Sequence, residues 1–208
     1  MKQLILLVIC ISTFQMIQSQ DKVDKTNLGS NSLIGIYSNI GVNQPFRFNK
    51  SSGDDWFRGK ESFSFGFDYL KTLSQKLKIN IEVNYSKYKV RIEAPENPQI
   101  PSIAPFTESF AMITVPIQIR LYSLKNYFLS FGSLIDFDLP REGDWLFTDT
   151  QSGFGLTLGA GKELIRNNFS IDIIPNLGIH SLIPFKSEES QQRLFEAGLK
   201  IGINYKIN

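Results

Sequence analysis

The feature that most constrains the fold of this chain is a period-two alternation of apolar and polar residues, which recurs in eight separate runs between residues 32 and 208. In the run LKINIEVNY, at 77–85, every odd-numbered residue is apolar or aromatic and every even-numbered residue is polar. The run SFSFGFDY, at 62–69, places four aromatic residues on one side in the same way. An extended strand separates such residues onto opposite faces, whereas a helix would scatter both sets. The alternation therefore predicts an all-β fold.

The connections between the predicted strands are alternately long and short. Three short connections fall on the same side as both termini, and four long ones fall on the other side. Outer-membrane barrels have short periplasmic turns and longer extracellular loops, whereas a soluble sandwich has no reason to sort its loops. We therefore expect an eight-stranded antiparallel up-and-down transmembrane β-barrel with its apolar faces toward lipid. The predicted strands are 32–42, 62–69, 76–91, 109–122, 127–137, 152–163, 169–180 and 194–207.

The amino terminus predicts export. Lys2 supplies a minimal positive region, and an apolar core from Leu4 to Ile11 precedes polar residues, which is typical of a signal peptide and too short for a membrane-spanning helix. We predict a signal peptide over 1–19 with cleavage after Ser19, a short periplasmic segment over 20–31, and an outer-membrane barrel over 32–208. The predicted location is the outer membrane of a Gram-negative bacterium.

Composition excludes several classes of site. Cys10 is the only cysteine and lies in the predicted signal peptide, so the mature chain has no disulfide or thiolate metal site. A single histidine excludes an imidazole cluster, and we expect no metal and no cofactor. The formal net charge of +2 falls to +1 once Lys2 leaves with the signal peptide, which argues against nucleic-acid binding.

Several segments also resemble a known group of proteins. The strand TVPIQIRLY, the glycine-rich strand GFGLTLGAGKEL with its partner NNFSIDI, and the closing segment GLKIGINYKI are similar to small outer-membrane β-barrels of the porin-like superfamily. The similarity is in particular to PorT-like barrels of Bacteroidetes-type bacteria, and Gln20 after the predicted cleavage site also looks like exported proteins of that group. The resemblance covers residues 32–208, and it implies an accessory role in secretion or envelope assembly.

The interior of an eight-stranded barrel is filled by side chains or holds one small ligand. The predicted lumen-facing positions carry charges of both signs, which can form a paired polar plug; a gated or ligand-selective path is the alternative. The glycines at 153, 155, 159 and 161 are expected to give room to larger lumen side chains such as Arg120 or Phe128. The predicted lumen network is Asp68, Glu82, Arg120, Asp172, Glu196 and Lys200.

His180 and Ser181 are the nearest approach to a catalytic pair. Adjacent residues on a strand point to opposite faces, so their side chains are not expected to hydrogen-bond, and we predict a histidine at the barrel rim and no catalytic residue. Trp56 and Trp145 lie in predicted outward loops, where each either contacts a partner or braces the loop.

Aromatic residues near the strand ends are expected to form girdles at the two membrane interfaces. The predicted girdle residues are Tyr69, Tyr122, Tyr127 and Tyr205 on the periplasmic side and Phe110, Phe137 and Phe147 on the other.

Two functional hypotheses follow from these observations. The first is a non-enzymatic, monomeric barrel in contact with outer-membrane lipid, whose loops or turns bind a protein partner. The second is a small-ligand conduit or a barrel-embedded lipid-modifying enzyme. The absence of a convincing catalytic set favours the first.

Overall fold

The structure is a computed structural model that describes residues 32–48, 56–93, 104–124, 126–141, 148–186 and 191–207. The predicted signal peptide, the segment 20–31, Cys10, Trp145 and Phe147 lie outside the described residues.

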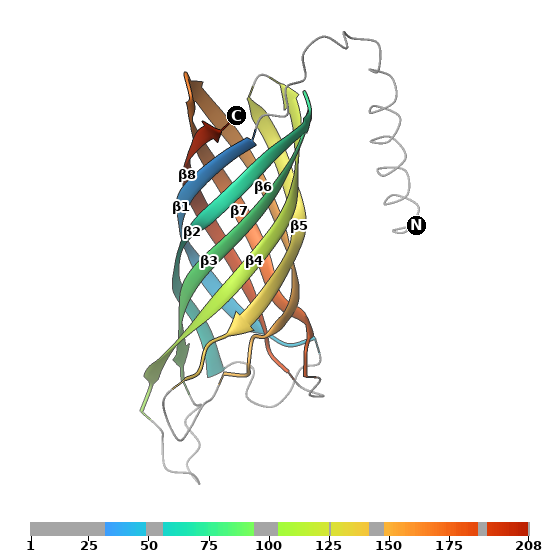
Figure 1. Cartoon of the computed structure of the whole chain (residues 1–208). Coiled ribbons are helices and arrows are strands. Elements are labelled where there is room, and N and C mark those ends of the chain that lie inside the picture. Colours follow the sequence, from blue (N-terminus) through green and yellow to red (C-terminus); the bar gives the residue numbers. More distant parts are fainter. Residues whose placement is uncertain are drawn as a thin grey trace, which may run out of the picture.

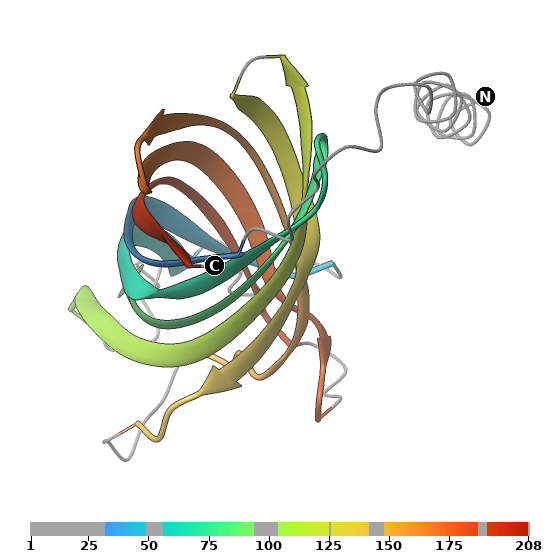
Figure 2. The ribbon, with the colours of Figure 1, turned by 45° about the horizontal axis from the view of Figure 1, so that its top comes forward.

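Eight strands form one closed ring (Figures 1 and 2). Each strand is antiparallel to the next along the chain, and β1 closes the ring against β8 from the pair Ser32–Ile207 to the pair Phe46–Arg193. This confirms the predicted eight-stranded antiparallel barrel. The strands are β1 (Ser32–Phe46), β2 (Phe57–Ser74), β3 (Leu77–Ile92), β4 (Phe106–Leu124), β5 (Tyr127–Asp138), β6 (Gly153–Arg166), β7 (Phe169–Pro184) and β8 (Arg193–Ile207).

Short connections join the strands at one end of the barrel. They consist of 75–76, 125–126 and 167–168, and this short-turn end also carries the C-terminal residues of β8 (Figure 1). Asn126 and Asn167 have φ values of 68° and 55°. Asparagine tolerates this left-handed conformation better than most residues, which suits it to tight hairpin turns. The opposite end, reached by the connections 47–56, 93–105, 139–152 and 185–192, is called the long-loop end below.

The strands extend further toward the long-loop end than the sequence predicts. The sequence predicts the first two strands over 32–42 and 62–69, with the polar segment 43–60 between them as a loop, but β1 continues to Phe46 and β2 begins at Phe57. Phe46 pairs with Arg193, and Phe57 pairs with Ile92. Cross-strand pairing thus overrides the local preference of this polar, glycine-containing segment for a loop.

The outer surface of the barrel is apolar along most of its height. On β2 the alternating residues Phe63, Phe65 and Phe67 are 47–66% exposed, whereas Ser62, Ser64 and their even-numbered neighbours up to Leu70 are buried. A water-soluble protein rarely exposes so large a contiguous apolar surface, whereas a membrane barrel directs it to lipid. No helix in the described part of the chain has the length and hydropathy of a membrane span.

The aromatic girdle is only partly as predicted. Tyr69, Tyr127, Tyr205 and Phe137 are 38–48% exposed and lie on the outer surface. Phe110, however, is buried inside the barrel in an apolar cluster, and Tyr122 also points inward, where its ring packs on Phe128 with centroids 5.2 Å apart. Both residues have even-numbered positions on β4, whose odd-numbered residues face lipid, so the strand parity contradicts their assignment to a girdle.

Candidate functional site: the side-chain-filled lumen

The inward residues of β3 mark successive layers of the lumen from one end to the other. Lys78 lies near the short-turn end, Glu82 follows, Tyr88 lies beyond the middle, and Val90 approaches the long-loop end. Each of these side chains contacts partners from strands on other sides of the barrel. The lumen is therefore a stack of cross-barrel contacts.

The layer nearest the short turns was not predicted. Lys78 Nζ donates to both carboxylate oxygens of Glu163 at 2.9 and 2.8 Å, and it also lies 4.6 Å from the ring centroid of Tyr122. Both charged residues are on the inward parity of their strands, β3 and β6. Strand parity was the signal that could have identified this pair.

The next layer joins two of the predicted lumen residues. Arg120 Nη1 lies 2.5 Å from Asp172 Oδ2, and both side chains are 2% exposed. Asn204 donates to the same carboxylate oxygen at 3.1 Å, and the Arg120 guanidinium lies 4.8 Å from the centroid of Phe128. A buried ion pair of this kind offsets its desolvation only through close geometry and additional hydrogen bonds. The geometry is close and Asn204 adds one hydrogen bond, whereas Arg120 Nε and Asp172 Oδ1 have no hydrogen-bond partner among the described residues.

Glu82 and Lys200 form the third layer. Lys200 Nζ donates to both oxygens of Glu82 at 2.8 and 2.7 Å, and Asn80 donates to Glu82 at 2.6 Å. Asp68 lies beside them, at the pair position opposite Glu82, and is buried. Asp68 Oδ1 has no hydrogen-bond partner among the described residues, so the structure places Asp68 in the lumen without bringing it into this ion pair.

His180 and Glu196 belong to a fourth layer. His180 Nδ1 lies 3.0 Å from Asp136 Oδ1, and His180 Nε2 lies 3.1 Å from Glu196 Oε2. Tyr88 donates to the same oxygen of Glu196 at 2.8 Å. The other oxygen of Glu196 accepts from Ser62 and Asn39, each at 3.0 Å.

The prediction of a rim histidine is wrong, because His180 is 4% exposed inside the barrel. The expectation that His180 and Ser181 face opposite sides is also wrong. The register of β6 against β7 shifts between the pairs Phe154–Ile183 and Leu156–Ile179, and Ser181 has a φ of 50°. This β-bulge breaks the alternation, so both neighbours are buried.

The arrangement does not form a catalytic pair. Ser181 Oγ donates to the carbonyl of Ser152 at 3.3 Å, and its backbone N–H donates to Asp136. Both imidazole nitrogens of His180 face carboxylates, and the hydroxyl that contacts the ring belongs to Tyr88, 3.2 Å from Nε2. A nucleophilic serine needs the base within hydrogen-bond reach, which this geometry does not provide.

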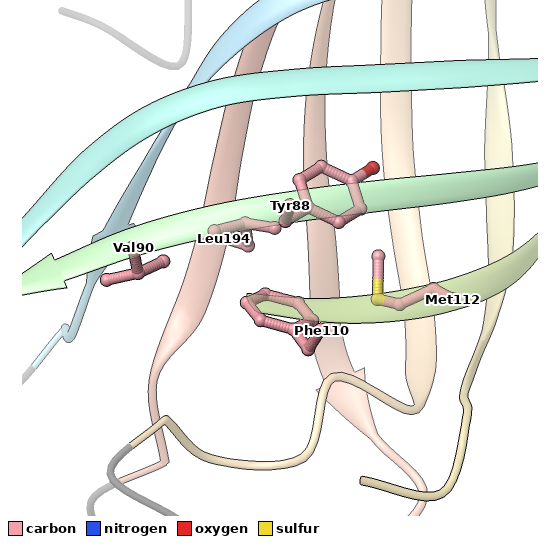
Figure 3. Packing of buried hydrophobic residues seen from close by; sticks show 5 residues of the cluster. All are labelled: Tyr88, Val90, Phe110, Met112 and Leu194. Atoms are coloured by element: carbon pink, nitrogen blue, oxygen red, sulfur yellow. The ribbon is translucent and has the colours of Figure 1, made fainter. Parts of the chain in front are cut away.

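Apolar side chains fill the lumen beyond His180. Figure 3 shows this apolar cluster, whose side chains come from β3, β4 and β8. Phe57 of β2 packs against the cluster. The rings of Tyr88 and Phe110 stack with centroids 5.4 Å apart. The cluster consists of Tyr88, Val90, Phe110, Met112 and Leu194.

Arg141 covers this cluster at the long-loop end. Its guanidinium lies 4.4 Å from the ring centroid of Phe110 and pairs with Asp138 and with Glu108, the latter at 3.3 Å. Arg141 Nη1 also donates to the carbonyl of Thr148 at 2.9 Å, which joins the two described parts of the β5–β6 connection.

The lumen contains a small cavity. A cavity of about 40 Å³ lies between the Glu82 and His180 layers, with Asn39, Asn84 and Gln118 among its lining residues, which is room for a few water molecules. Within the described ranges, no group of three or more His, Cys, Asp or Glu side chains could hold a metal ion.

One of the two tryptophans singled out by sequence is described. Trp56 is half-buried just before β2, and its backbone carbonyl accepts a hydrogen bond from the N–H of Glu93 at 2.8 Å. This backbone contact extends the β2–β3 pairing, and the two roles predicted for the Trp56 side chain, partner contact and loop bracing, stay predictions. Trp145 lies outside the described residues, so the same two predicted roles stay open for it.

The ring of strands, the apolar exterior and the polar interior define an eight-stranded transmembrane β-barrel. No protein-family model matches the chain, and no similar curated protein was found. Among solved structures, the outer membrane protein AlkL, determined by solid-state NMR in DMPC bilayers, is similar with a TM-score of 0.51 and 12% identity, covering 90% of this chain and 94% of AlkL. At this identity the likeness shows the fold alone.

Two further solved structures are similar at lower scores. The outer membrane protein OprG from Pseudomonas aeruginosa has a TM-score of 0.49 and 9% identity, covering 86% of this chain and 96% of OprG. Neisserial surface protein A has a TM-score of 0.45 and 14% identity, covering 85% of this chain and 97% of its own. The finer resemblance to PorT-like barrels stays a prediction.

Proposed function

We propose that this protein is a non-enzymatic outer-membrane barrel that is closed to solutes and acts through its exposed surfaces as a binding or envelope-accessory protein. The observation that carries the proposal is the filled lumen. Successive levels of the lumen are occupied by the Lys78–Glu163 ion pair, the Lys200–Glu82 ion pair, the His180 layer and the apolar cluster. A solute would have to break several buried, hydrogen-bonded charges to cross.

An accessory role accords with what the PorT-like resemblance implies for secretion or envelope assembly. The barrel then serves as a rigid support for the loops at one end and the turns at the other. By the asymmetry common to outer-membrane barrels, the long-loop end faces outward and the short-turn end faces the periplasm. No specific geometry in the lumen favours the conduit or enzyme alternative.

Conductance in planar bilayers tests the closed lumen. The mature barrel, refolded and inserted, is expected to give no stable single-channel openings, while an open porin in the same bilayers verifies the measurement. Reproducible openings by the wild-type protein would contradict the proposal. Location is tested separately, by outer-membrane fractionation together with heat-modifiable migration on a gel.

The binding role is tested by crosslinking in the native host. A protein that is captured by the wild-type barrel and lost when Trp56 and Trp145 are replaced by alanine supports partner binding at the long-loop end. If the wild-type barrel and the double alanine variant captured the same proteins, the partner would bind outside the two tryptophans. If neither captured any protein, the proposed accessory role would be refuted.

A further inference from the structure

The outward face of β3 changes its chemistry before the strand ends. Toward the short-turn end its exposed side chains are apolar, whereas the last three outward positions are all cationic. The neighbouring end of β2 adds two more cations beside them. We call this surface the basic strip; it consists of Arg58, Lys60, Lys87, Lys89 and Arg91.

The basic strip belongs to the barrel wall. Arg58 pairs with Arg91 in the β2–β3 register, and their side chains are 68% and 42% exposed. On the other side, the three β3 cations pair with Ala111, Ser109 and Thr107 of β4. These small neighbours leave the cationic groups uncovered.

The strip carries an excess of positive charge. Among the described residues, two carboxylates pair with the strip: Glu61, 2.7 Å from Lys89, and Glu93, 2.9 Å from Arg58 and 2.5 Å from Arg91. Within this described part of the chain, five cations against two anions leave a net charge of +3 (5 − 2). Lys60 and Lys87 make no ion pair within 4.0 Å to any described residue, so two of the five cations are available to an external anion.

A buried side chain holds the strip from inside the barrel. Asn43 is 4% exposed, and its Nδ2 lies 3.0, 3.3 and 3.1 Å from the backbone carbonyls of Lys60, Glu61 and Lys89. The three carbonyls belong to a β-bulge between Gly59 and Ser62. In this bulge two residues of β2, Lys60 and Glu61, lie opposite one residue of β3, Lys89. These hydrogen bonds therefore fix the spacing of the cations, all five of which lie within β2 and β3.

The strip begins where an aromatic part of the outer surface ends. Phe63 pairs with Lys87, and the rings of Phe65 and Tyr85 lie one step nearer the short-turn end with centroids 5.9 Å apart. On β5 and β7, by contrast, the outer face carries apolar side chains close to the long-loop end, at Phe137 and Ile183. Because the aromatic side chains contact acyl chains, the cations next to them lie at the level of lipid headgroups.

We propose that the basic strip binds the phosphate groups of a phosphorylated glycolipid in the outer leaflet. The inference rests on the outer-membrane location and orientation proposed above, and it adds a ligand site to them. Clustered Lys and Arg side chains beside the apolar region of a membrane protein attract anionic headgroups, and arginine and lysine both pair with phosphate oxygens. The apolar surface below the strip receives the acyl chains of the same molecule.

The experiment titrates the refolded full-length mature barrel in neutral detergent with lipid A carrying two phosphates, and native mass spectrometry measures the bound lipid. Replacing Lys87, Lys89 and Arg91 together by glutamine is expected to raise the dissociation constant about tenfold or more. The matched control replaces three exposed cations nearer the short-turn end, Lys71, Lys76 and Lys162, by glutamine, and it is expected to change the constant less than about twofold.

A second variant separates an organised site from net charge alone. Asn43→Leu keeps all five cations but removes the hydrogen bonds that hold the bulge, and it is expected to weaken lipid A binding several-fold. Heat-modifiable gel migration verifies that each variant has folded.

Three outcomes would overturn the proposal: equal losses in the strip and control variants, equal binding of dephosphorylated lipid A, or equal binding of phosphatidylglycerol. A barrel that binds lipid A as expected but fractionates with another membrane would instead refute the proposed location. The two failures are therefore distinguishable.

Discussion

Arg120 and Asp172 show how much a single buried contact depends on its partner. They come from β4 and β7 and form an ion pair with both side chains almost fully buried. The cost of burying each charge is offset only while the other is present.

Removal of one charge is expected to be worse than removal of both. Arg120→Met should lower the free energy of unfolding by about 3–5 kcal/mol because it leaves the buried Asp172 carboxylate without its cation. The double variant R120M/D172L should recover a large part of that loss. Urea unfolding in vesicles measures both, and a double variant that is as unstable as the sum of the two single variants would contradict this explanation.

Gly161 shows a second residue-scale constraint. A Cβ atom at Gly161 would lie 2.5 Å from Cζ of Phe128. Gly161 therefore leaves room for the Phe128 ring, as predicted from the sequence. Arg120 is not among the three atoms nearest that position.

Gly161→Ala is expected to destabilise the barrel by about 1–3 kcal/mol through overpacking, and Phe128→Leu should restore part of the loss. Gly178→Ala is the matched control, because its Cβ would meet no atom closer than 3.6 Å. Equal losses at both glycines in the same unfolding assay would show that backbone entropy, and not the Phe128 ring, decides the effect.

Individual strands show where sequence patterns suffice and where they fail. Alternation correctly assigns the faces of β1, where Ile34 and Ile36 point to lipid and Tyr37 points inward, because parity is a local property of an extended chain. It fails at His180 and Ser181, because a bulge depends on how β6 and β7 pair and leaves no signal in either strand alone. Parity also places the six predicted charges inward, but it does not indicate which cation meets which carboxylate.

The β7 bulge makes a prediction about backbone conformation. Ser181 has a positive φ, which glycine adopts freely and β-branched residues resist. Ser181→Gly is therefore expected to change the unfolding free energy by less than about 1 kcal/mol, whereas Ser181→Val should cost clearly more. If the valine variant matched the glycine variant, the bulge would not constrain this position.

The molecule as a whole has a lipid-facing belt whose tolerance to charge should vary with depth. Val83 lies midway along the outward face of β3 and is 51% exposed, whereas Thr107 lies outward at the long-loop end of β4. Val83→Arg is expected to cost about 2–4 kcal/mol in vesicles and Thr107→Arg about 0–1 kcal/mol. Equal costs at the two positions would mean that the apolar surface does not face acyl chains.

The place of β8 in the ring has a consequence for biogenesis. β8 completes the ring against β1 and also supplies Lys200 and Glu196, which pair with Glu82 of β3 and His180 of β7. Until β8 docks, the Glu82 carboxylate lacks the Lys200 ammonium group, and the edges of β1 and β7 stay open. Closure of the ring and neutralisation of Glu82 should thus occur in the same step.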